Sequence, residues 1–345
     1  MKRLFLMLLG AMTLCTMQAQ IVEQGEPALV YYSPKTTVAV EFAYTVESFE
    51  PGIYASYAEE MIGASDAVKE RKQVFTLKSA QIGTKTEADY SRPHKIMPEA
   101  GVPILLTISP KGLLVGYNTG EMAKKEPNKT FDNKDKKKGQ STKKEVAPLP
   151  EEVLTASNPL AQAHAVAKQI FHIRETRSYL LNGEVEHAPA DGRSMELVLA
   201  ELDKQEKALT ELFVGKKNKQ AKHKTVYIDP NKEEKLLFFS EENGFTDADN
   251  IDADTIKVTL KADKQVYMAP STDKKKKAPA VTQIVYNLPG HSAVTVQYKG
   301  KRWAQRTLDI AQFGIDVPVS KELFVGGLPK IVFSEKSGNI QSITK

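Results

Sequence analysis

The chain has 345 residues, of which 26% are charged and 41% are hydrophobic, with a formal net charge of +5. The positive charge is local: residues 124–150 hold nine lysines and four acids, and Lys2 and Arg3 stand at the start of the chain. The rest of the chain is slightly acidic, which excludes the broad basic surface of a nucleic-acid-binding protein.

The first 19 residues have the pattern of a cleavable signal peptide. Lys2 and Arg3 precede an apolar run at residues 4–15, and the small residue Ala19 is suited to a signal peptidase. We expect cleavage between Ala19 and Gln20. The apolar run is shorter than the roughly 20 residues of a membrane span, and nothing downstream reaches that length. We therefore expect an exported protein without a transmembrane span, located in the periplasm, at the outer membrane or outside the cell.

The single cysteine, Cys15, lies inside this signal. It follows Leu14 rather than a small residue, which argues against lipidation. The mature chain would then contain no thiol, so disulfides, a cysteine nucleophile and thiolate metal sites are excluded. Its stability must come from a packed core, for which its length is ample and suggests about two domains.

Residues 20–120 are expected to form a mixed α+β region. Residues 38–46 alternate between apolar and smaller or polar side chains, which predicts a strand that ends before Pro51-Gly52. A short helix follows over residues 54–62 and ends at Gly63, and another strand contains Phe75 and Leu77. Residues 104–108 and 113–117 flank a turn sequence and predict a hairpin.

Residues 121–150 are rich in lysine, asparagine and proline and predict a disordered linker or surface loop. Residues 151–215 predict an antiparallel helical hairpin. Asn158 before Pro159 is a helix start, and Asn182-Gly183 is a helix end. A second helix is expected from near Ser194 to Gly215. A further lysine-rich run at 216–224 is assigned no secondary structure.

Residues 225–345 are expected to be β-rich, forming a sandwich or an open barrel. The predicted fold class is therefore α+β, with a mixed N-terminal region, a central helical hairpin and a C-terminal β-rich region. The expected strands lie at residues 236–239, 256–260, 281–286, 294–298, 308–313 and 331–333.

Candidate functional residues are few. Arg177 falls on the apolar face of the first long helix, so we expect an ion pair with an acid such as Glu184 or one from the sheet, with anion recognition as the alternative. His172 and Glu175 share a helix face but lack a third metal ligand. An acidic stretch around Asn250 resembles a calcium loop without the EF-hand pattern, so a solvated loop is the better interpretation. Its weak candidate ligands are Asp247, Asp249, Asp252 and Asp254.

His291 and Ser292 are adjacent, and neighbours on a strand point to opposite faces, which argues against a catalytic pair. Asp254-Thr255-Ile256 is similar to the O-glycosylation acceptor of exported proteins in Bacteroidetes, which makes Thr255 a hypothetical modification site. The chain contains no G-x-S-x-G, P-loop or G-x-G-x-x-G motif. No catalytic residue and no cofactor is predicted.

Six segments of the chain together carry a family resemblance. They are Pro51-Gly52-Ile53-Tyr54-Ala55, Tyr57-Ala58-Glu59, Ile173-Arg174-Glu175-Thr176-Arg177, Leu180-Leu181-Asn182-Gly183-Glu184, Ala190-Asp191-Gly192 and Ile310-Ala311-Gln312-Phe313-Gly314. Together they resemble an exported family typical of Bacteroidetes, domain-of-unknown-function family 4831. The resemblance covers most of the mature chain and implies an envelope protein, but it brings no activity and no catalytic residues.

The sequence does not determine the function. The leading hypothesis is a non-catalytic binding or scaffold protein of the cell envelope with a protein or glycan partner. The alternative is an exported hydrolase that uses carboxylates from distant positions. A pocket with two carboxylates in acid and base roles would favour the enzyme, whereas a shallow apolar patch would favour the binding protein.

Overall fold

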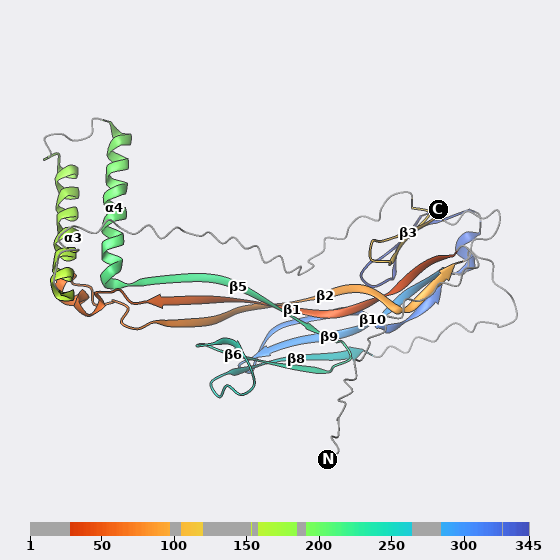
Figure 1. Ribbon diagram of the computed structural model, residues 1–345. Helices are drawn as coiled ribbons and strands as arrows, with labels where there is room; N and C mark the ends of the chain where they lie inside the picture. Colours follow the sequence, from red (N-terminus) through yellow and green to blue (C-terminus); the bar gives the residue numbers. More distant parts are fainter. Residues whose placement is uncertain are drawn as a thin grey trace, which may run out of the picture.

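The computed structural model describes residues 28–96, 105–119, 153, 158–184, 191–263, 284–325 and 327–344. The expected signal peptide and the lysine-rich segment 121–150 lie outside these residues. The described chain is a mixed α and β structure with three antiparallel sheets and a helical hairpin, and it is long and narrow (Figure 1). The α+β class is thus confirmed.

Two very long strands form the axis of the molecule. Strand β1 (Leu29–Glu50) pairs antiparallel with β2 (Lys72–Ile96) along nearly its whole length, and β5 (Lys216–Ile228) pairs with the other side of β1. At about 3.3 Å per residue, the 22 residues of β1 extend about 70 Å. The resulting three-stranded sheet has the order β2-β1-β5.

The second sheet packs against the middle of this axis. Its order is β10-β9-β8-β6-β7, formed by β6 (Glu234–Ser240), β7 (Gly244–Thr246), β8 (Asp254–Asp263), β9 (Val285–Tyr298) and β10 (Lys301–Pro318). Val38, Val40 and Phe42 of β1 are fully buried against apolar side chains of β8, β9 and β10. This contact is the largest apolar core described.

A third, four-stranded sheet lies at one end of the axis. Its order is β12-β11-β4-β3, with β3 (Leu106–Ile108), β4 (Leu114–Tyr117), β11 (Lys330–Phe333) and β12 (Ile340–Thr344). A short helical turn, η3 (Lys321–Phe324), precedes β11. Tyr31 of β1 and Ile96 of β2 are buried in the core beneath this sheet.

The helical hairpin lies at the opposite end (Figure 1). Helix α3 (Pro159–Asn182) begins where the Asn158 side chain accepts a hydrogen bond from the Ala161 amide, and it ends at Gly183 in the left-handed conformation. Helix α4 (Gly192–Val214) is capped by Asp191 and begins two residues before the expected Ser194. The predicted hairpin is confirmed. The sequence could predict it because each helix carries local start and stop signals.

A small helical cap packs under the hairpin. It consists of η1 (Ala55–Tyr57) and α1 (Ala58–Ile62), which ends at Gly63 as expected from the sequence. Tyr54, Ala58 and Met61 are buried with Ile170 of α3 and Phe213 of α4. The cap therefore joins the end of β1 to both long helices.

Two features of the fold differ from what the sequence predicts. Residues 216–224, for which no strand was predicted, belong to β5, because the β1 backbone pairs with them although all nine residues are exposed. Strands from residues 20–120 and from residues after 216 also share sheets, so these segments are not separate in space.

The described helices include none that is both long enough and apolar enough to cross a membrane.

The hairpin joins β1 and β5 through close main-chain contact. The Tyr54 amide donates to the Leu212 carbonyl at 2.8 Å, and a Cβ added at Gly52 would lie 2.2 Å from that carbonyl oxygen. A Cβ added at Gly215 would lie 2.3 Å from the carbonyl oxygen of Glu50. Only glycine permits the chain to approach this closely at the joint.

We expect Gly52→Ala to lower the free energy of unfolding by at least about 2 kcal/mol, because the methyl group must displace backbone atoms. Urea unfolding followed by circular dichroism measures the change. Gly192→Ala is the matched control, since a Cβ there meets nothing within 4 Å and alanine favours the helix. Equal stability of the two variants would contradict a tight joint.

Candidate functional site

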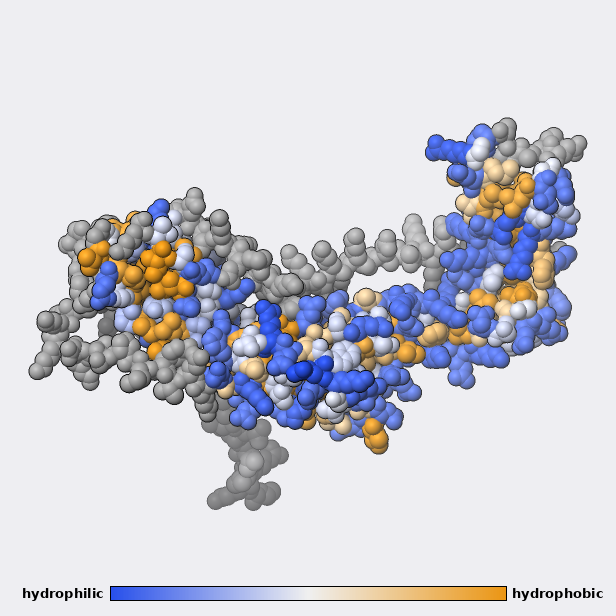
Figure 2. Space-filling view, turned by 180° about the vertical axis from the view of Figure 1, so that it is seen from behind, coloured by the Kyte–Doolittle hydropathy of each residue, from blue (hydrophilic) through white to orange (hydrophobic). Residues whose placement is uncertain are grey.

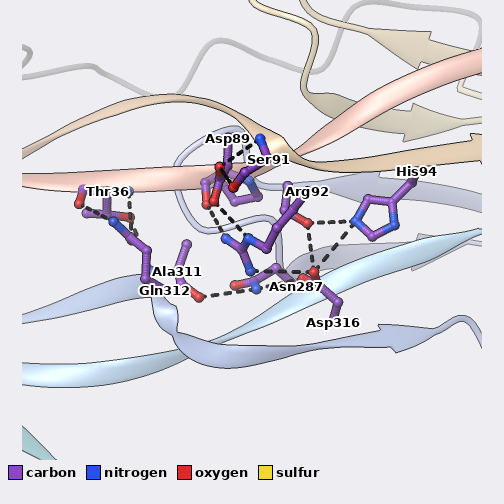
Figure 3. A network of polar contacts seen from close by, with 11 residues as sticks. Thr36, Asp89, Ser91, Arg92, His94, Asn287, Ala311, Gln312 and Asp316 are labelled. Carbon is purple, nitrogen blue, oxygen red and sulfur yellow. Dashed lines mark hydrogen bonds and ion pairs between the residues drawn. The ribbon is translucent and has the colours of Figure 1, made fainter. Parts of the chain in front are cut away.

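A cluster of polar side chains lies where β1 and β2 cross β9 and β10 (Figure 3). Ser33 and Thr36 come from β1, and Asp89, Ser91, Arg92 and His94 from β2. Asn287 comes from β9, and Gln312 and Asp316 from β10. We call these residues the Asp316 cluster. It brings together charged and polar side chains from four strands that are distant from one another in the sequence.

Asp316 is at the centre of the cluster. Its Oδ2 atom accepts a hydrogen bond from the Ser33 hydroxyl at 2.9 Å and lies 3.4 Å from Nη1 of Arg92 and 3.6 Å from Nε2 of His94. Its Oδ1 atom accepts from the Asn287 amide at 2.9 Å. Three other strands therefore supply partners for a single carboxylate.

The pKa of Asp316 reflects these partners. Burial disfavours the ionised form, but His94, Asn287, Ser33 and the charge of Arg92 together outweigh it and lower the pKa from 3.8 to about 2. Asp316 is thus a carboxylate throughout the neutral range.

Arg92 connects Asp316 to a second carboxylate. Its Nε donates to Asp89 at 2.9 Å, and its Nη2 donates to the carbonyl oxygen of Pro34 at 2.9 Å. Burial tends to raise the pKa of Asp89, yet hydrogen bonds from Ser91 and Arg92 lower it below its usual value. Both carboxylates beside Arg92 are therefore ionised, and the guanidinium links β1, β2 and β10.

A bulge in β10 extends the cluster along β1. The register between β9 and β10 shifts between Ile310 and Ile315, so residues 311–314 leave the regular ladder. Gln312 then bonds both backbone groups of Thr36, accepting from its amide and donating to its carbonyl, each at 2.8 Å. A Cβ added at Gly314 would lie 1.7 Å from the Leu288 carbonyl oxygen, so the bulge requires glycine there. The segment Ile310-Ala311-Gln312-Phe313-Gly314, part of the family resemblance, contains this bulge.

The geometry of Ser33, His94 and Asp316 differs from that of a catalytic triad. In a triad the imidazole accepts the hydroxyl proton and the carboxylate contacts the other ring nitrogen. Here the Ser33 hydroxyl donates to Asp316, and the same nitrogen, Nε2 of His94, lies 2.7 Å from Ser33 and 3.6 Å from Asp316. Because a hydroxyl has one hydrogen, Nε2 is the donor to Ser33, whose side chain is buried. This arrangement orients Asp316 and does not activate Ser33.

The carboxylate pair does not suit acid and base catalysis either. Hydrolysis by two carboxylates needs one that stays protonated near neutral pH. Asp89 and Asp316 both have lowered pKa values. The arrangement holds strands together and offers no proton donor.

A small cavity lies next to the cluster. Its volume is about 10 Å³, and Tyr31, Ser33 and Asn287 are among the residues that line it. The Oδ1 atom of Asn287 is buried and has no partner among the described protein groups. A space of this size fits one water molecule and is far too small for an organic substrate.

Arg177 has its partners on the neighbouring helix. Its Nη2 atom pairs with Asp203 and with Glu206, the latter at 2.7 Å, and Arg174 also pairs with Glu206 at 2.6 Å. The ion pair was expected, but α4 provides the acids and not Glu184 or the sheet. Arg177 therefore ties α3 to α4, with its Nε buried and without a hydrogen-bond partner in the described structure.

The acidic loop before β8 shows no assembled metal site. No group of three or more metal-ligating side chains occurs among the described residues. Asp254 accepts a hydrogen bond from Tyr298 and pairs with Lys299 at 3.0 Å, and Asn250 bonds the amide of Asp252. Asp247 and Asp249 precede these residues on the same loop. A solvated loop stays the prediction, and the weak calcium candidates Asp247, Asp249, Asp252 and Asp254 gain no geometric support from the described residues.

The remaining candidates lie on the surface or are separated. His291 pairs with Asp309 at 2.8 Å, whereas Ser292 is buried and donates to the Lys261 carbonyl, so the two side chains point apart as expected. Glu175 accepts a hydrogen bond from Tyr179. Thr255 is exposed on β8 and would be accessible for the hypothetical glycosylation.

Sequence reasoning missed the Asp316 cluster. Its members come from residues 33–36, 89–94, 287 and 312–316, and no motif links them. One local signal was available: Asp316 stands between Ile315 and Val317, and an acid inside an apolar strand needs partners.

A family model matches most of the chain. The model of a family described as a domain of unknown function, DUF4831, matches residues 28–341. The chain belongs to this family. The DUF4831 match extends over all three sheets and the helical hairpin, so the Asp316 cluster lies inside the family domain. Comparisons with curated proteins and with solved structures found no match.

We expect Asp316→Asn to destabilise the protein at neutral pH by about 2 kcal/mol, which corresponds to the fall in pKa from 3.8 to about 2. Because the folded-state pKa is lowered, this contribution is complete above about pH 4 and is lost as the pH falls towards 2. The unfolding free energy of the variant should therefore depend less on pH between 4 and 2 than that of the unmodified protein.

Asp309→Asn is the control for this measurement. Asp309 is an exposed acid of the same strand, and its pair with His291 lies at the surface, where an ion pair contributes at most about 1 kcal/mol. Similar losses in the two variants would show that burial and hydrogen bonding of Asp316 are unimportant.

Proposed function

We propose that this chain is an exported, non-catalytic binding protein of the cell envelope, and that its helical hairpin is the part that contacts a partner protein. The observation that carries the proposal is the position of the hairpin, which stands at the far end of the long β axis, away from both other cores (Figure 1). A helix pair in this position is accessible along most of its surface.

The surface chemistry of the hairpin supports a protein partner. Large apolar side chains are exposed along α3 and α4, including Phe171 at 50%, Leu181 at 65% and Leu197 at 66% exposure. Figure 2 shows apolar patches on the hairpin among hydrophilic residues. Apolar groups with a polar surround are typical of protein interfaces.

The rest of the molecule suits a rigid support. We infer that the packed three- and five-stranded sheets act as a sandwich-like body, with the Asp316 cluster holding β1, β2, β9 and β10 in register. The main-chain contacts at Gly52 and Gly215 fix the hairpin to this body. A surface that is already ordered loses less conformational entropy on binding.

The Asp316 cluster supports the interpretation that the protein is not an enzyme. It has the serine, histidine and carboxylates from which hydrolases are built, but its hydrogen bonds leave no activated nucleophile and no protonated acid. The signal pattern at residues 1–19 supports export. Export is consistent with a role in the cell envelope.

Site-specific photocrosslinking in intact cells tests the proposal. A photoreactive amino acid at Leu197 should form a discrete adduct with a protein, identified by mass spectrometry. The control position is Ile251, which is 98% exposed but lies in the acidic loop before β8, far from the hairpin in sequence and fold. Adducts at Ile251 and none at Leu197 would move the binding surface to the β body, and none at either position would overturn the binding role.

A further inference from the structure

Strand β5 is an edge strand with an unusual composition. β1 lies on one side of it, and none of the described strands pairs with its other side. Its sequence contains five lysines and no acid, and residues 216–224 are all exposed. An edge this long presents a row of backbone donors and acceptors to any extended chain that approaches.

The lysines differ between the two faces of β5. Side chains of a strand alternate between faces, so Lys217, Lys219 and His223 share one face, and Lys216, Lys222 and Lys224 the other. Lys216, at the start of the strand, pairs with Glu211 of α4 at 2.8 Å. On the first face each of these basic side chains has an acid beside it: Asp66 lies 3.6 Å from Lys217, Glu47 2.7 Å from Lys219 and Glu41 3.3 Å from His223. This face is already neutralised by the protein's own carboxylates.

The second face has unbalanced positive charge. Lys222 lies opposite Tyr44 and Lys224 opposite Phe42 on β1, so their cross-strand neighbours carry no charge. No carboxylate of the described residues lies within ion-pair distance of either lysine. The Lys224 ammonium lies 4.5 Å from the centre of the Phe245 ring, a cation–π contact that holds it at the margin of the main core. Lys222 and Lys224 are thus two residues apart, on one face, and available to an acid.

We propose that β5 is the docking site of an acidic polypeptide segment that adds to the three-stranded sheet as a fourth strand. The backbone edge supplies the hydrogen bonds, and Lys222 and Lys224 select acidic residues at alternate positions of the incoming segment. Directly opposed side chains on paired strands have Cβ atoms about 5 Å apart, within ion-pair reach. The residues between these acids face the neutralised side and need not be charged.

The same features disfavour two other occupants. A second copy of this chain would bring one basic β5 against another, and like charges in opposed positions are destabilising. A polyanion without amide groups could pair with the lysines but would leave the backbone edge unbonded. Lysines on an edge strand prevent pairing with neutral and basic strands but still permit pairing with an acidic strand. The strand that can bind is therefore selected by excluding the others.

This inference depends on the proposed binding role but concerns a different surface from the hairpin. Photocrosslinking at Leu197 reports on the hairpin alone. Binding of an acidic peptide reports on β5 alone, so each experiment can fail without the other.

The probe is a fluorescein-labelled peptide of nine residues that alternates Thr and Glu, titrated with the full chain produced from Gln20 onward and followed by fluorescence anisotropy. We expect saturable binding that weakens when Gln replaces Glu. Binding should also be lost when alternate backbone amides of the peptide are N-methylated on the edge that faces β5. Hydrogen exchange should slow in residues 216–228 when the peptide binds.

Lys222→Glu with Lys224→Glu should weaken binding about tenfold or more, since two attractive pairs become repulsive. Lys301→Glu with Lys330→Glu is the matched control, with the same change in net charge on exposed strand residues elsewhere, and it should change affinity less than about twofold. The neutral variant Lys222→Gln with Lys224→Gln should lie between them. Circular dichroism verifies that every variant is folded.

Three outcomes would overturn the proposal. They are absence of binding by the Glu peptide, equal binding by the N-methylated peptide, and equal loss of affinity in both charge-reversal variants. Equal binding by the N-methylated peptide would mean that β5 attracts anions without strand pairing.

Discussion

The architecture depends on the uninterrupted pairing of β1 with β2. A strand of 22 residues is far longer than one sheet of a small domain requires, and here it passes through two cores and leads into a third. Its middle is buried against the five-stranded sheet, its first residues against the four-stranded sheet, and its last residues lead into the helical cap. The cores are small individually, so the shared strands are what makes them one body.

A long ladder has a weakness that the Asp316 cluster corrects. Shifting β1 by one residue would exchange its two faces, but shifting it by two would keep the apolar pattern and cost little in burial. Asp316, Arg92 and the pair of bonds between Gln312 and Thr36 can be satisfied in one register alone. Buried polar contacts cost more free energy when one partner is lost than they contribute when formed, so they are suited to specifying the register. The cluster therefore specifies alignment more than it adds stability.

Local signals predicted much of the fold. Helix ends were predicted from the sequence because they depend on contacts within a few residues, as at Asn158, Pro159, Gly183 and Gly63. β5 was not predicted because its lysines do not alternate with apolar residues. Its strand conformation depends on pairing with β1, whose residues lie 166 to 190 positions earlier in the chain. The ion pair of Arg177 was expected from its place on an apolar face, but its acids depend on how α3 and α4 pack. The Asp316 cluster draws on four strands, which no sequence window can bring together.

The direction of the long strands also determines how the molecule responds to mechanical force. The hairpin and the four-stranded sheet lie at opposite ends of β1, so tension between them acts along the strand axis. Hydrogen bonds of antiparallel strands are perpendicular to that axis, which loads them simultaneously in shear and not one after another as in unzipping. The load would be distributed over the whole β1–β2 ladder, from residue 29 to residue 49. A force applied to the helices would therefore be transmitted to the far end of the protein before any single hydrogen bond bore it alone.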